Sequence, residues 1–329
     1  MPDPRIFEQV RYWMFALDPL HVGAGQQKIG RIDLPVLRES GTNLPVIPGT
    51  SLSGVTRAYA ALSMDRPQCS GKGGAEGQSH CGDCPVCHAF GWAKGSSGSR
   101  QGLVQLFTAH LLLFPIATTR GPVWITCPQQ LEAAGISSGL PAEMAGVSSG
   151  LPAIEDGNFI VLKGNFTQPQ LDFGWLYLNK LDGLQDSDLA QWRFPSRHAD
   201  DRVSELQPIP SVLLNKVQQC VLVGNAMFKR LVDDNLEVRT LVSIKPETGA
   251  AEDGALFTYE AIPRSSLLWF DAVYNNPAIF NATIGSNGSR APMEMTALRD
   301  VMNRGISLMQ YLGLGGMNTR GLGRVWIQS

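Results

Sequence analysis

The pattern of hydrophobic and polar positions predicts a protein of short strands and a few amphipathic helices, joined by glycine-rich connections. Apolar runs of strand length, rich in core residues, occur at 11–17 (RYWMFAL) and at 103–114. Apolar residues recur with helical spacing at 51–63 (SLSGVTRAYAALS) and at 296–310. We therefore expect an α+β protein.

The second half of the chain predicts a helix and a long β-hairpin. Residues 211–232 have the apolar spacing of a helix. Two β-rich runs, 237–246 and 254–262, flank the turn sequence PETGAAED, and a third β-rich run covers 265–274. These runs predict a hairpin over 237–262 followed by a core strand.

The chain closes with a helix, a glycine-rich loop and a strand at 324–327 (RVWI). The glycines resemble a dinucleotide-binding fingerprint, but that loop follows a strand and opens a helix, which is the reverse of the order found here. The order instead fits the closing half of a ferredoxin-like unit. The glycines of this loop are Gly313, Gly315, Gly316, Gly321 and Gly323.

Residues 134–155 contain a tandem copy with an eleven-residue period, AGISSGLPAEM followed by AGVSSGLPAIE. Two copies are too few for a solenoid, which needs three or more units. Gly, Ser and Pro recur throughout, a composition typical of surface segments that tolerate insertion. We expect a mobile surface insertion without a catalytic part.

Composition and charge narrow the class of protein. With 329 residues and 43% hydrophobic content, the chain can bury a large core in one domain or two. The start, MPDPRIFEQV, lacks the regions of a signal peptide, and the longest apolar run, LLLFPIA, is too short to span a membrane. We therefore expect a cytoplasmic protein without a membrane segment.

The net charge of −2 argues against a protein that coats nucleic acid by electrostatic attraction alone. The distribution of charge is uneven, however, because both glycine-bearing segments are locally cationic. This favours a channel for a specific polyanion. The basic residues of the two segments are Lys28, Arg31, Arg38 and Arg57, and Arg299, Arg304, Arg320 and Arg324.

A cysteine cluster predicts a metal centre. Cys81, Cys84 and Cys87 follow CxxCxxC spacing, and Cys69 precedes them across a polar loop. Four thiolates suit structural zinc, and a closed ligand set leaves no position for a catalytic water.

The sequence alone does not decide which residues bind the metal. The flanking His80 or His88 leaves a Cys3His site open, and the thiols could also be unliganded or belong to an iron–sulfur or redox site. Disulfides are disfavoured in a reducing compartment. The remaining thiols, Cys127 and Cys220, are expected to be buried side chains.

The segment from 21 to 57 combines a flexible loop, one acid and a helix start. Gly23, Gly25 and Gly30 let a ligand approach the main chain closely. Residues 32–34 predict a short strand at a sheet edge, with Asp33 pointing opposite to its apolar neighbours. Beyond it, the free N–H groups and positive dipole of the helix beginning near Ser51 suit a phosphate, and Arg57 adds a charged fork.

Asp33 suits metal-dependent chemistry better than proton transfer. An aspartate pKa of about 3.9 is far from neutral pH, which makes a lone aspartate a poor general base. A carboxylate in a cationic groove can instead hold Mg²⁺ against a scissile phosphate. If the polyanion is RNA, its 2′-hydroxyl supplies the nucleophile, so a sparse site suffices. The alternative is that Asp33 caps local N–H groups, and His21 is open between a base or phosphate donor and a structural group.

Several of these motifs resemble one family. HVGAG (21–25), IDLPV (32–36) and LPVIPGTSLSGVTR (44–57) are similar to the opening of the RAMP superfamily, the RNA-binding proteins of CRISPR effector complexes. GALFTYE (254–260) and YLGLGGMNTRGLGRV (311–325) extend the resemblance over nearly the whole chain. The likeness is strongest to the backbone subunits of type III-B (Cmr) complexes.

The resemblance implies a single domain, 1–329, with a ferredoxin-like, RRM-related palm. It implies three insertions: a zinc-stapled one at about 65–100, a flexible duplicated loop at 131–156, and a region of about 200–262 that ends in a β-hairpin thumb. In the family this thumb presses on the RNA of the neighbouring subunit. A plain sheet edge is the alternative for the hairpin.

The implied function is that of a repeated subunit that binds guide RNA and cleaves complementary target RNA with magnesium. Its partners would be guide RNA, target RNA, copies of itself and other CRISPR effector subunits. The family's cleaving aspartate maps to Asp33, and auxiliary groups near the cut map to Glu252, Tyr259 and Glu260, the last two on opposite faces of a strand. The residues implied to contact RNA are Gly23, Gly25, Lys28, Arg31, Ser51, Arg57, Gly315, Gly316, Arg320 and Arg324.

Three further functions stay open from the sequence. The first is a related RAMP subunit that binds RNA and assembles without cutting. The second is a free repeat-processing endoribonuclease, against which the five histidines, with no evident pair, argue mildly. The third is a zinc-dependent protein-interaction module without RNA. Phe257, Trp269 and Phe270 could stack on bases, although the core is their more common place.

Overall fold

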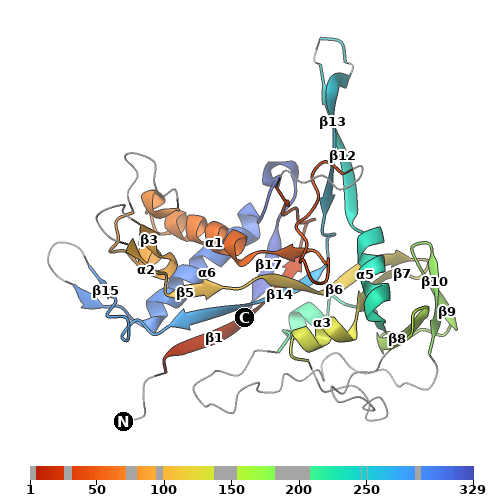
Figure 1. Ribbon diagram of the computed structural model, residues 1–329, viewed down its shortest axis with the longest axis horizontal. Helices are drawn as coiled ribbons and strands as arrows, with labels where there is room; N and C mark the ends of the chain where they lie inside the picture. The colour runs from red at the N-terminus through yellow and green to blue at the C-terminus, as the bar shows by residue number, and fades with distance from the viewer. Residues whose placement is uncertain are drawn as a thin grey trace.

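A large mixed sheet organises the chain (Figure 1). The computed structural model describes residues 5–25, 32–71, 80–93, 99–136, 154–181, 208–245, 247–249, 251–285 and 290–329. The eleven-stranded sheet has the main order β17-β1-β14-β6-β7-β11-β8-β10-β9, with β2 and β5 paired at its side. Together with a few helices, this arrangement confirms the predicted mixture of α and β structure.

The inner part of the sheet is built from strands distant in sequence. β1 (Phe7–Ala16) pairs with β14 (Leu267–Asn275) on one edge and with β17 (Val325–Gln328) on the other, and β14 pairs with β6 (Ala109–Thr118). All three pairings are antiparallel. Helix α1 (Gly49–Ser63) lies between β1 and β6 in the chain, and α6 (Met295–Leu312) lies between β14 and β17.

Alternation along the strands divides the core between the two faces of the sheet. In β1, Tyr12 and Met14 join the core cluster that includes α1 and α6, whereas Trp13 and Phe15 join the cluster that includes α3 (Pro128–Ala133). Both faces are therefore covered (Figure 1). The helices on the first face cross closely, because a Cβ on Gly305 would lie 2.5 Å from the Thr56 carbonyl oxygen.

The outer part of the sheet corrects the prediction of a helix over 211–232. This segment forms α4 (Ser211–Leu214), β11 (Cys220–Val223) and α5 (Asn225–Asp234). The four residues of β11 are all buried between β7 and β8, so tertiary pairing overrides the helical spacing. The other outer strands are β7 (Gly121–Thr126), β8 (Asn158–Lys163), β9 (Gln170–Phe173) and β10 (Leu176–Lys180).

The predicted hairpin is confirmed. β12 (Glu237–Ile244) and β13 (Ala251–Ala261) pair antiparallel and project away from the sheet as the long arm at the top of Figure 1. Val238, Val242 and Leu256 are exposed on this arm. The arm therefore presents apolar surface outside the core.

Short elements complete the structure. The predicted strand over 103–114 is divided into β5 (Val104–Leu106) and β6, and the duplicated segment falls mostly outside the described residues. In the described part of the chain, no helix is long and apolar enough to cross a membrane. The remaining elements are β2 (Val46–Ile47), β3 (Trp92–Ala93), β4 (Ser99–Arg100), β15 (Thr283–Ile284), β16 (Ala291–Pro292), α2 (Pro85–Phe90) and two 3-10 turns, Pro67–Cys69 and Asn318–Arg320.

A buried ion pair joins β1 to β14. The Arg11 side chain is 1% exposed, its Nε lies 2.8 Å from Asp271 Oδ1, and its guanidinium carbon lies 4.2 Å from the centre of the Trp269 ring. Asp271→Ala would leave this guanidinium without its carboxylate. We expect the free energy of unfolding, measured by urea denaturation, to fall by about 3–5 kcal/mol.

The matched control is the exposed pair of Asp300 and Arg304, whose Oδ2 and Nε lie 2.7 Å apart. Because solvent screens such a pair, Asp300→Ala should change the free energy of unfolding by less than about 0.5 kcal/mol. Similar losses in the two variants would contradict a structural role for the buried pair.

Candidate functional site

Three segments that are far apart in the sequence meet around His21. Leu20 bridges Ile262 at the end of β13, and His21 Nδ1 lies 2.6 Å from the Glu260 carbonyl oxygen. From the other side, the Gly316 N–H donates to the His21 carbonyl oxygen at 2.8 Å. His21 is 6% exposed. Through these contacts His21 joins the first loop, the hairpin and the C-terminal glycine loop.

The C-terminal loop needs glycine at Gly315 for two reasons. Its φ of +88° is strained for other residues, and a Cβ there would lie 2.4 Å from the His21 carbonyl oxygen. Gly321 has a similar φ of +84° but nothing within 4 Å of a Cβ. A side chain at Gly321 would therefore meet backbone strain alone, whereas one at Gly315 would meet both strain and a steric clash.

We expect Gly315→Ala to lower the free energy of unfolding by about 1–3 kcal/mol more than Gly321→Ala, because only the first variant adds a clash to the strain. Chemical denaturation of the two variants measures the difference. Equal losses would mean that the loop relaxes away from His21.

Asp33 lies against the base of the hairpin. Its Oδ2 accepts a hydrogen bond from the Thr258 N–H at 3.0 Å, and the Thr258 hydroxyl lies 3.4 Å away. The Asp33 and Leu34 N–H groups both donate to the Thr258 carbonyl oxygen, and Leu34 forms a parallel bridge with Tyr259. The predicted strand at 32–34 is thus a short extended segment held against the edge of β13, and Asp33 is placed by a strand more than two hundred residues away.

Tyr259 and Glu260 point to opposite sides of β13. Tyr259 is buried in a small cluster with Leu34 and Leu322. Glu260 is also buried, accepts from the Val36 N–H at 3.1 Å and pairs with the Arg38 guanidinium at 3.3 Å. Because both side chains are enclosed, their contacts hold the first loop on the hairpin.

A cation and an aromatic ring lie next to this junction. The Arg320 guanidinium carbon is 6.0 Å from the centre of the Phe257 ring, and Phe257 directly precedes Thr258. Arg320 is exposed. The pair therefore offers a positive charge and a ring face close in sequence to the partner of Asp33. Trp269 and Phe270 are buried in the core, as their more common role predicts.

Arg324, unlike Arg320, forms an ion pair within the described part of the chain. Its Nε and Nη2 donate to the two carboxylate oxygens of Asp18 at 2.5 and 3.2 Å. The hydrogen bond from the Arg324 guanidinium lowers the pKa of the Asp18 carboxyl. This paired cation adds less positive potential to the loop than its sequence position suggests.

Helix α1 begins at the predicted place, with Ser51 in its first turn. Arg57 lies two turns further on, and its Nε donates to the Cys69 carbonyl oxygen at 2.8 Å. An open groove beside this half of the helix is lined by Ser53, Arg57 and Gly71. Arg57 thus borders a groove while it holds the loop that carries Cys69.

The four clustered cysteines form the second candidate centre. Their Sγ atoms lie within 4.8 Å of one another, with 3.6 Å between Cys69 and Cys81 and 3.8 Å between Cys81 and Cys87. These distances are far longer than a disulfide bond of about 2.05 Å. Burial raises the pKa of Cys69 to about 11, and a hydrogen bond with Cys87, together with burial, raises the pKa of Cys84. The cluster can hold a metal ion, which would favour the thiolate forms.

The flanking histidines have other contacts. His80 Nδ1 lies 3.1 Å from Arg57 Nη2, and the buried His88 ring meets Trp92 edge-on, with ring centres 5.5 Å apart. In the part of the chain that the structure describes, neither joins the group of four sulfurs. Cys127 and Cys220 are buried elsewhere, as predicted.

A family model described as RAMP superfamily matches residues 16–326. The chain belongs to the RAMP superfamily. The match includes both glycine-bearing segments, the cysteine cluster and the hairpin. The resemblance of the sequence motifs is thereby confirmed at the level of the family.

Individual RAMP relatives match over almost the full length. The CRISPR system Cmr endoribonuclease Cmr4 of Pyrococcus furiosus is 23% identical over 326 residues, which are 95% of this chain and 92% of the relative. A type III-B Cmr-beta structure bound to cognate target RNA has a TM-score of 0.62 at 14% identity and covers 99% of this chain and 98% of its own. The crystal structure of oligomeric Cmr4 from Pyrococcus furiosus has a TM-score of 0.55 at 19% identity and covers 98% of both chains.

Within this RAMP fold, the structure brings together many of the residues singled out from the sequence. Asp33, His21, Tyr259 and Glu260 share one junction with the loop that carries Gly315 and Gly316. Gly23 lies in the same segment, where it bridges Val36, and Gly25 follows it at a φ of +82°. Lys28 and Arg31 lie outside the described residues, as does the Glu252 side chain.

Two residues of the junction are not identifiable from the sequence. Thr258, which hydrogen-bonds Asp33, carries no sequence signal beyond its place in a β-rich run. Arg38 stands out in the sequence only as a basic residue, yet it joins Glu260 to Asp233 on α5. The contacts of both residues depend on the pairing of β13 with the first loop.

Proposed function

We propose that this chain is a repeated backbone subunit of a type III CRISPR ribonucleoprotein that binds guide RNA and cleaves complementary target RNA. The observation that carries the proposal is the junction of Asp33 with Thr258, beside the cationic loop of Arg320. The Pyrococcus furiosus relative named as a Cmr endoribonuclease supports the proposal, since the similarity covers 95% of this chain and 92% of the relative. The partners would be guide RNA, target RNA, further copies of the chain and other effector subunits, in the cytoplasm.

The strand order supports the domain plan of this proposal. The order β17-β1-β14-β6, antiparallel throughout and with α1 and α6 as crossovers, matches that of a ferredoxin-like unit, and we assign this part to an RRM-related palm. The segments at about 65–100, 131–156 and 200–262 are then insertions into one domain. In this proposal the projecting β12–β13 arm is the thumb, whose exposed apolar side chains suit contact with a neighbouring copy.

Asp33 is the proposed cleavage residue. Its carboxylate would hold Mg²⁺ together with phosphate oxygens, and the ion, when bound, lowers the pKa of the nucleophile and neutralises charge on the scissile phosphate. Thr258 orients the carboxylate through Oδ2. The RNA 2′-hydroxyl is the nucleophile, so the chain's own task is to hold the backbone in line. His21, Tyr259 and Glu260 position the loop that carries Asp33 in this scheme.

The RNA path would follow the two cationic segments. The RNA backbone would be contacted from the first loop by Gly23, Gly25, Lys28 and Arg31. It would be contacted from the last loop by Gly315, Gly316 and Arg320. Ser51 and Arg57 add the start of α1, and the groove beside them supports a guide contact there. Arg324 would first have to leave Asp18.

We assign structural zinc to the cysteine cluster, because its sulfur separations suit a tetrahedral site. Neighbouring sulfurs in a tetrahedral site with Zn–S bonds of about 2.3 Å are about 3.8 Å apart. The Sγ atoms of Cys69 and Cys84 lie 3.7 Å apart, and the separations of Cys81 from Cys69 and Cys87 are 3.6 and 3.8 Å. A four-sulfur site of this kind has a structural role, and Arg57 would link it to α1.

One observation favours a second candidate, a RAMP subunit that assembles on RNA without cutting. Thr258 engages Asp33 Oδ2 through its N–H, and its hydroxyl lies within 3.4 Å of the same oxygen, which would also serve a purely structural aspartate. Such a subunit would retain guide binding and assembly, so only cleavage separates the two candidates.

Assembly tests the proposal against a free nuclease. Chain reconstituted with guide RNA and partner subunits should form particles whose mass grows with guide length, because each copy covers a fixed stretch of RNA. Cuts in the target should recur at a constant spacing. Light scattering that gives the same mass with short and long guides would favour the free enzyme.

Removing the tip of the hairpin, Glu247–Asp253, should weaken this regular stacking. The fold should persist, because the tip lies at the far end of the arm (Figure 1). The measurement is particle mass at fixed guide length, with circular dichroism as the control for folding. If the particle mass is unchanged, the hairpin does not act as a thumb on the neighbouring copy.

A further inference from the structure

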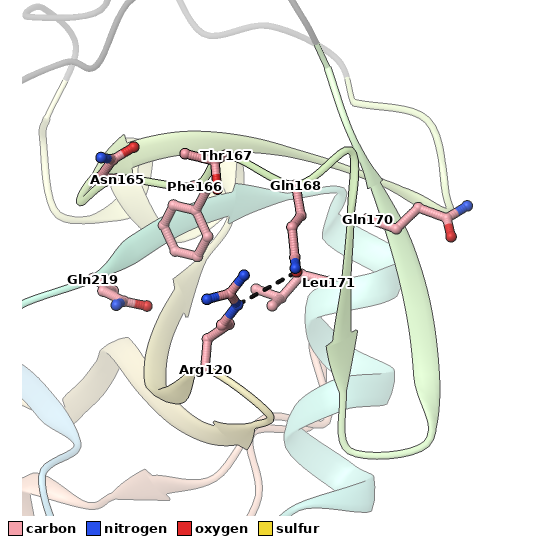
Figure 2. Close-up of a pocket in the computed structure, with 8 residues that line it drawn as sticks. All are labelled: Arg120, Asn165, Phe166, Thr167, Gln168, Gln170, Leu171 and Gln219. Carbon is pink, nitrogen blue, oxygen red and sulfur yellow. Dashed lines mark hydrogen bonds between the residues drawn. The ribbon is translucent and has the colours of Figure 1, made fainter.

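A cavity of about 140 Å³ lies in the outer part of the sheet, and none of the residues of the Asp33 junction lines it (Figure 2). It is bordered by the turn between β6 and β7, the loop between β8 and β9, and the residue before β11. Its rim includes the exposed Asn165, Thr167 and Gln168. None of its lining residues has a part in the proposed RNA cleavage.

Two side chains that line the cavity, Arg120 and Gln219, have hydrogen-bonding groups that could still bind a ligand. The Arg120 guanidinium donates to Gln168 Oε1 at 3.4 Å, its one side-chain hydrogen bond within the described residues. Gln219 Oε1 is buried and has no hydrogen-bond partner in the same part of the structure. In Figure 2 the Arg120 guanidinium lies among the other lining side chains, with Phe166 and Gln219 on one side and Gln168 and Leu171 on the other. A buried acceptor without a partner is uncommon in proteins and points to a missing donor.

The apolar wall is held in place. Phe166 is 8% exposed, packs edge-on against Phe159 and has its carbonyl oxygen bound by Lys180 Nζ at 2.8 Å. Leu171 is buried opposite it. The rest of the lining is polar, so Phe166 and Leu171 give a bound ligand an apolar face on which to pack.

The polar groups select the chemistry of the ligand. Sulfate, carboxylate and a phosphate diester accept hydrogen bonds from Arg120 but give no donor to Gln219, and a cationic group gives no acceptor to Arg120. A primary amide has both functions, but it has no ring face to pack on Phe166. A planar heterocycle with a donor and an acceptor on one edge satisfies both residues and the wall.

The volume selects a single ring, because a cavity of about 150 Å³ holds benzene. We propose that this cavity binds a pyrimidine nucleobase, with its carbonyl oxygen toward Arg120, its N–H toward Gln219 and its ring against Phe166. Pyrimidines have adjacent donors and acceptors on their Watson–Crick edge, which proteins read in single-stranded RNA. The sugar and phosphate remain at the exposed rim. The base belongs either to a free nucleotide or to an unpaired RNA residue.

Calorimetric titration of the full chain with cytidine or uridine monophosphate tests the site, with ribose phosphate as the reference ligand. We expect saturable binding of at least one pyrimidine nucleotide and at least tenfold weaker binding of ribose phosphate. Gln219→Leu should weaken pyrimidine binding at least tenfold without lowering the melting temperature, because it removes an unpartnered buried oxygen. The matched control is Gln218→Leu, an exposed neighbour, which should bind as the natural chain does.

Several results would overturn the inference. These are the absence of saturable pyrimidine binding, equal binding of ribose phosphate, unchanged binding in Gln219→Leu, or displacement of the nucleotide by acetamide, which would assign the cavity to a partner's amide. Arg120→Met provides an independent variant, since it removes the guanidinium from an exposed position, and it should also weaken pyrimidine binding at least tenfold.

Photocrosslinking distinguishes the two sources of the base. Single-stranded RNA that contains thiouridine should crosslink to the segment 165–168 if the base belongs to RNA. Nucleotide binding without that crosslink assigns the site to a free nucleotide.

Discussion

Asp33→Asn is expected to remove magnesium-dependent cutting of target RNA while guide and target binding stay near those of the natural chain. Asparagine has the same shape and can still accept from the Thr258 N–H, so the loop should keep its place on β13. The loss is that of a metal-binding charge, worth several kcal/mol in the transition state. Since about 1.4 kcal/mol corresponds to tenfold in rate, we expect cleavage to slow by about two to three orders of magnitude.

The measurement is single-turnover cleavage of labelled target RNA by the assembled complex, with and without Mg²⁺. Asp300→Asn, an exposed acid on α6, is the matched control and should cut at the natural rate. If Asp33→Asn cuts at the natural rate, Asp33 does not take part in cleavage, and other residues must hold the metal ion. A deoxy substitution at the cut position should also stop the reaction if the 2′-hydroxyl is the nucleophile.

Cys84→Ser is expected to lower zinc content and thermal stability together. Structural zinc sites of this type contribute on the order of 10 kcal/mol of apparent binding energy, and Cys84 also opens α2 as its N-cap. We expect about one zinc per natural chain, a large fall in the variant, and a lower melting temperature. Elemental analysis and thermal denaturation of protein purified without chelator measure both quantities.

Cys127→Ser is the matched control, because Cys127 is also buried but lies outside the cluster. It should lose some stability by placing a hydroxyl in a buried site, yet retain its zinc. Natural protein without bound zinc, or equal zinc content in the two variants, would remove the metal centre from the proposed function.

The local elements were largely predictable. Helices α1 and α6, the strand β1 and the hairpin of β12 and β13 all follow patterns that are local in the sequence. The cysteine spacing likewise pointed to one metal cluster, because CxxC turns bring thiols together locally. For these features the interactions that stabilise the element are close in sequence.

The segment 211–232 shows where local patterns fail. Its apolar spacing suits a helix, yet Cys220–Val223 are buried on both sides as a strand between β7 and β8. Strand pairing with distant partners decided the outcome, because burial of four apolar residues outweighs a weak helical preference.

Residue patterns alone were enough to indicate the family, the main helices, the hairpin and the cysteine cluster, and they made Asp33 a candidate for the cleavage site. Which side chains meet became known only from the folded chain: Asp33 with Thr258, Arg324 with Asp18, Arg57 with the cysteine loop. The cavity of Arg120 and Gln219 belongs to the same class. Propensity and spacing act over a few residues, whereas these contacts join residues brought together only when the sheet closes and its core is buried.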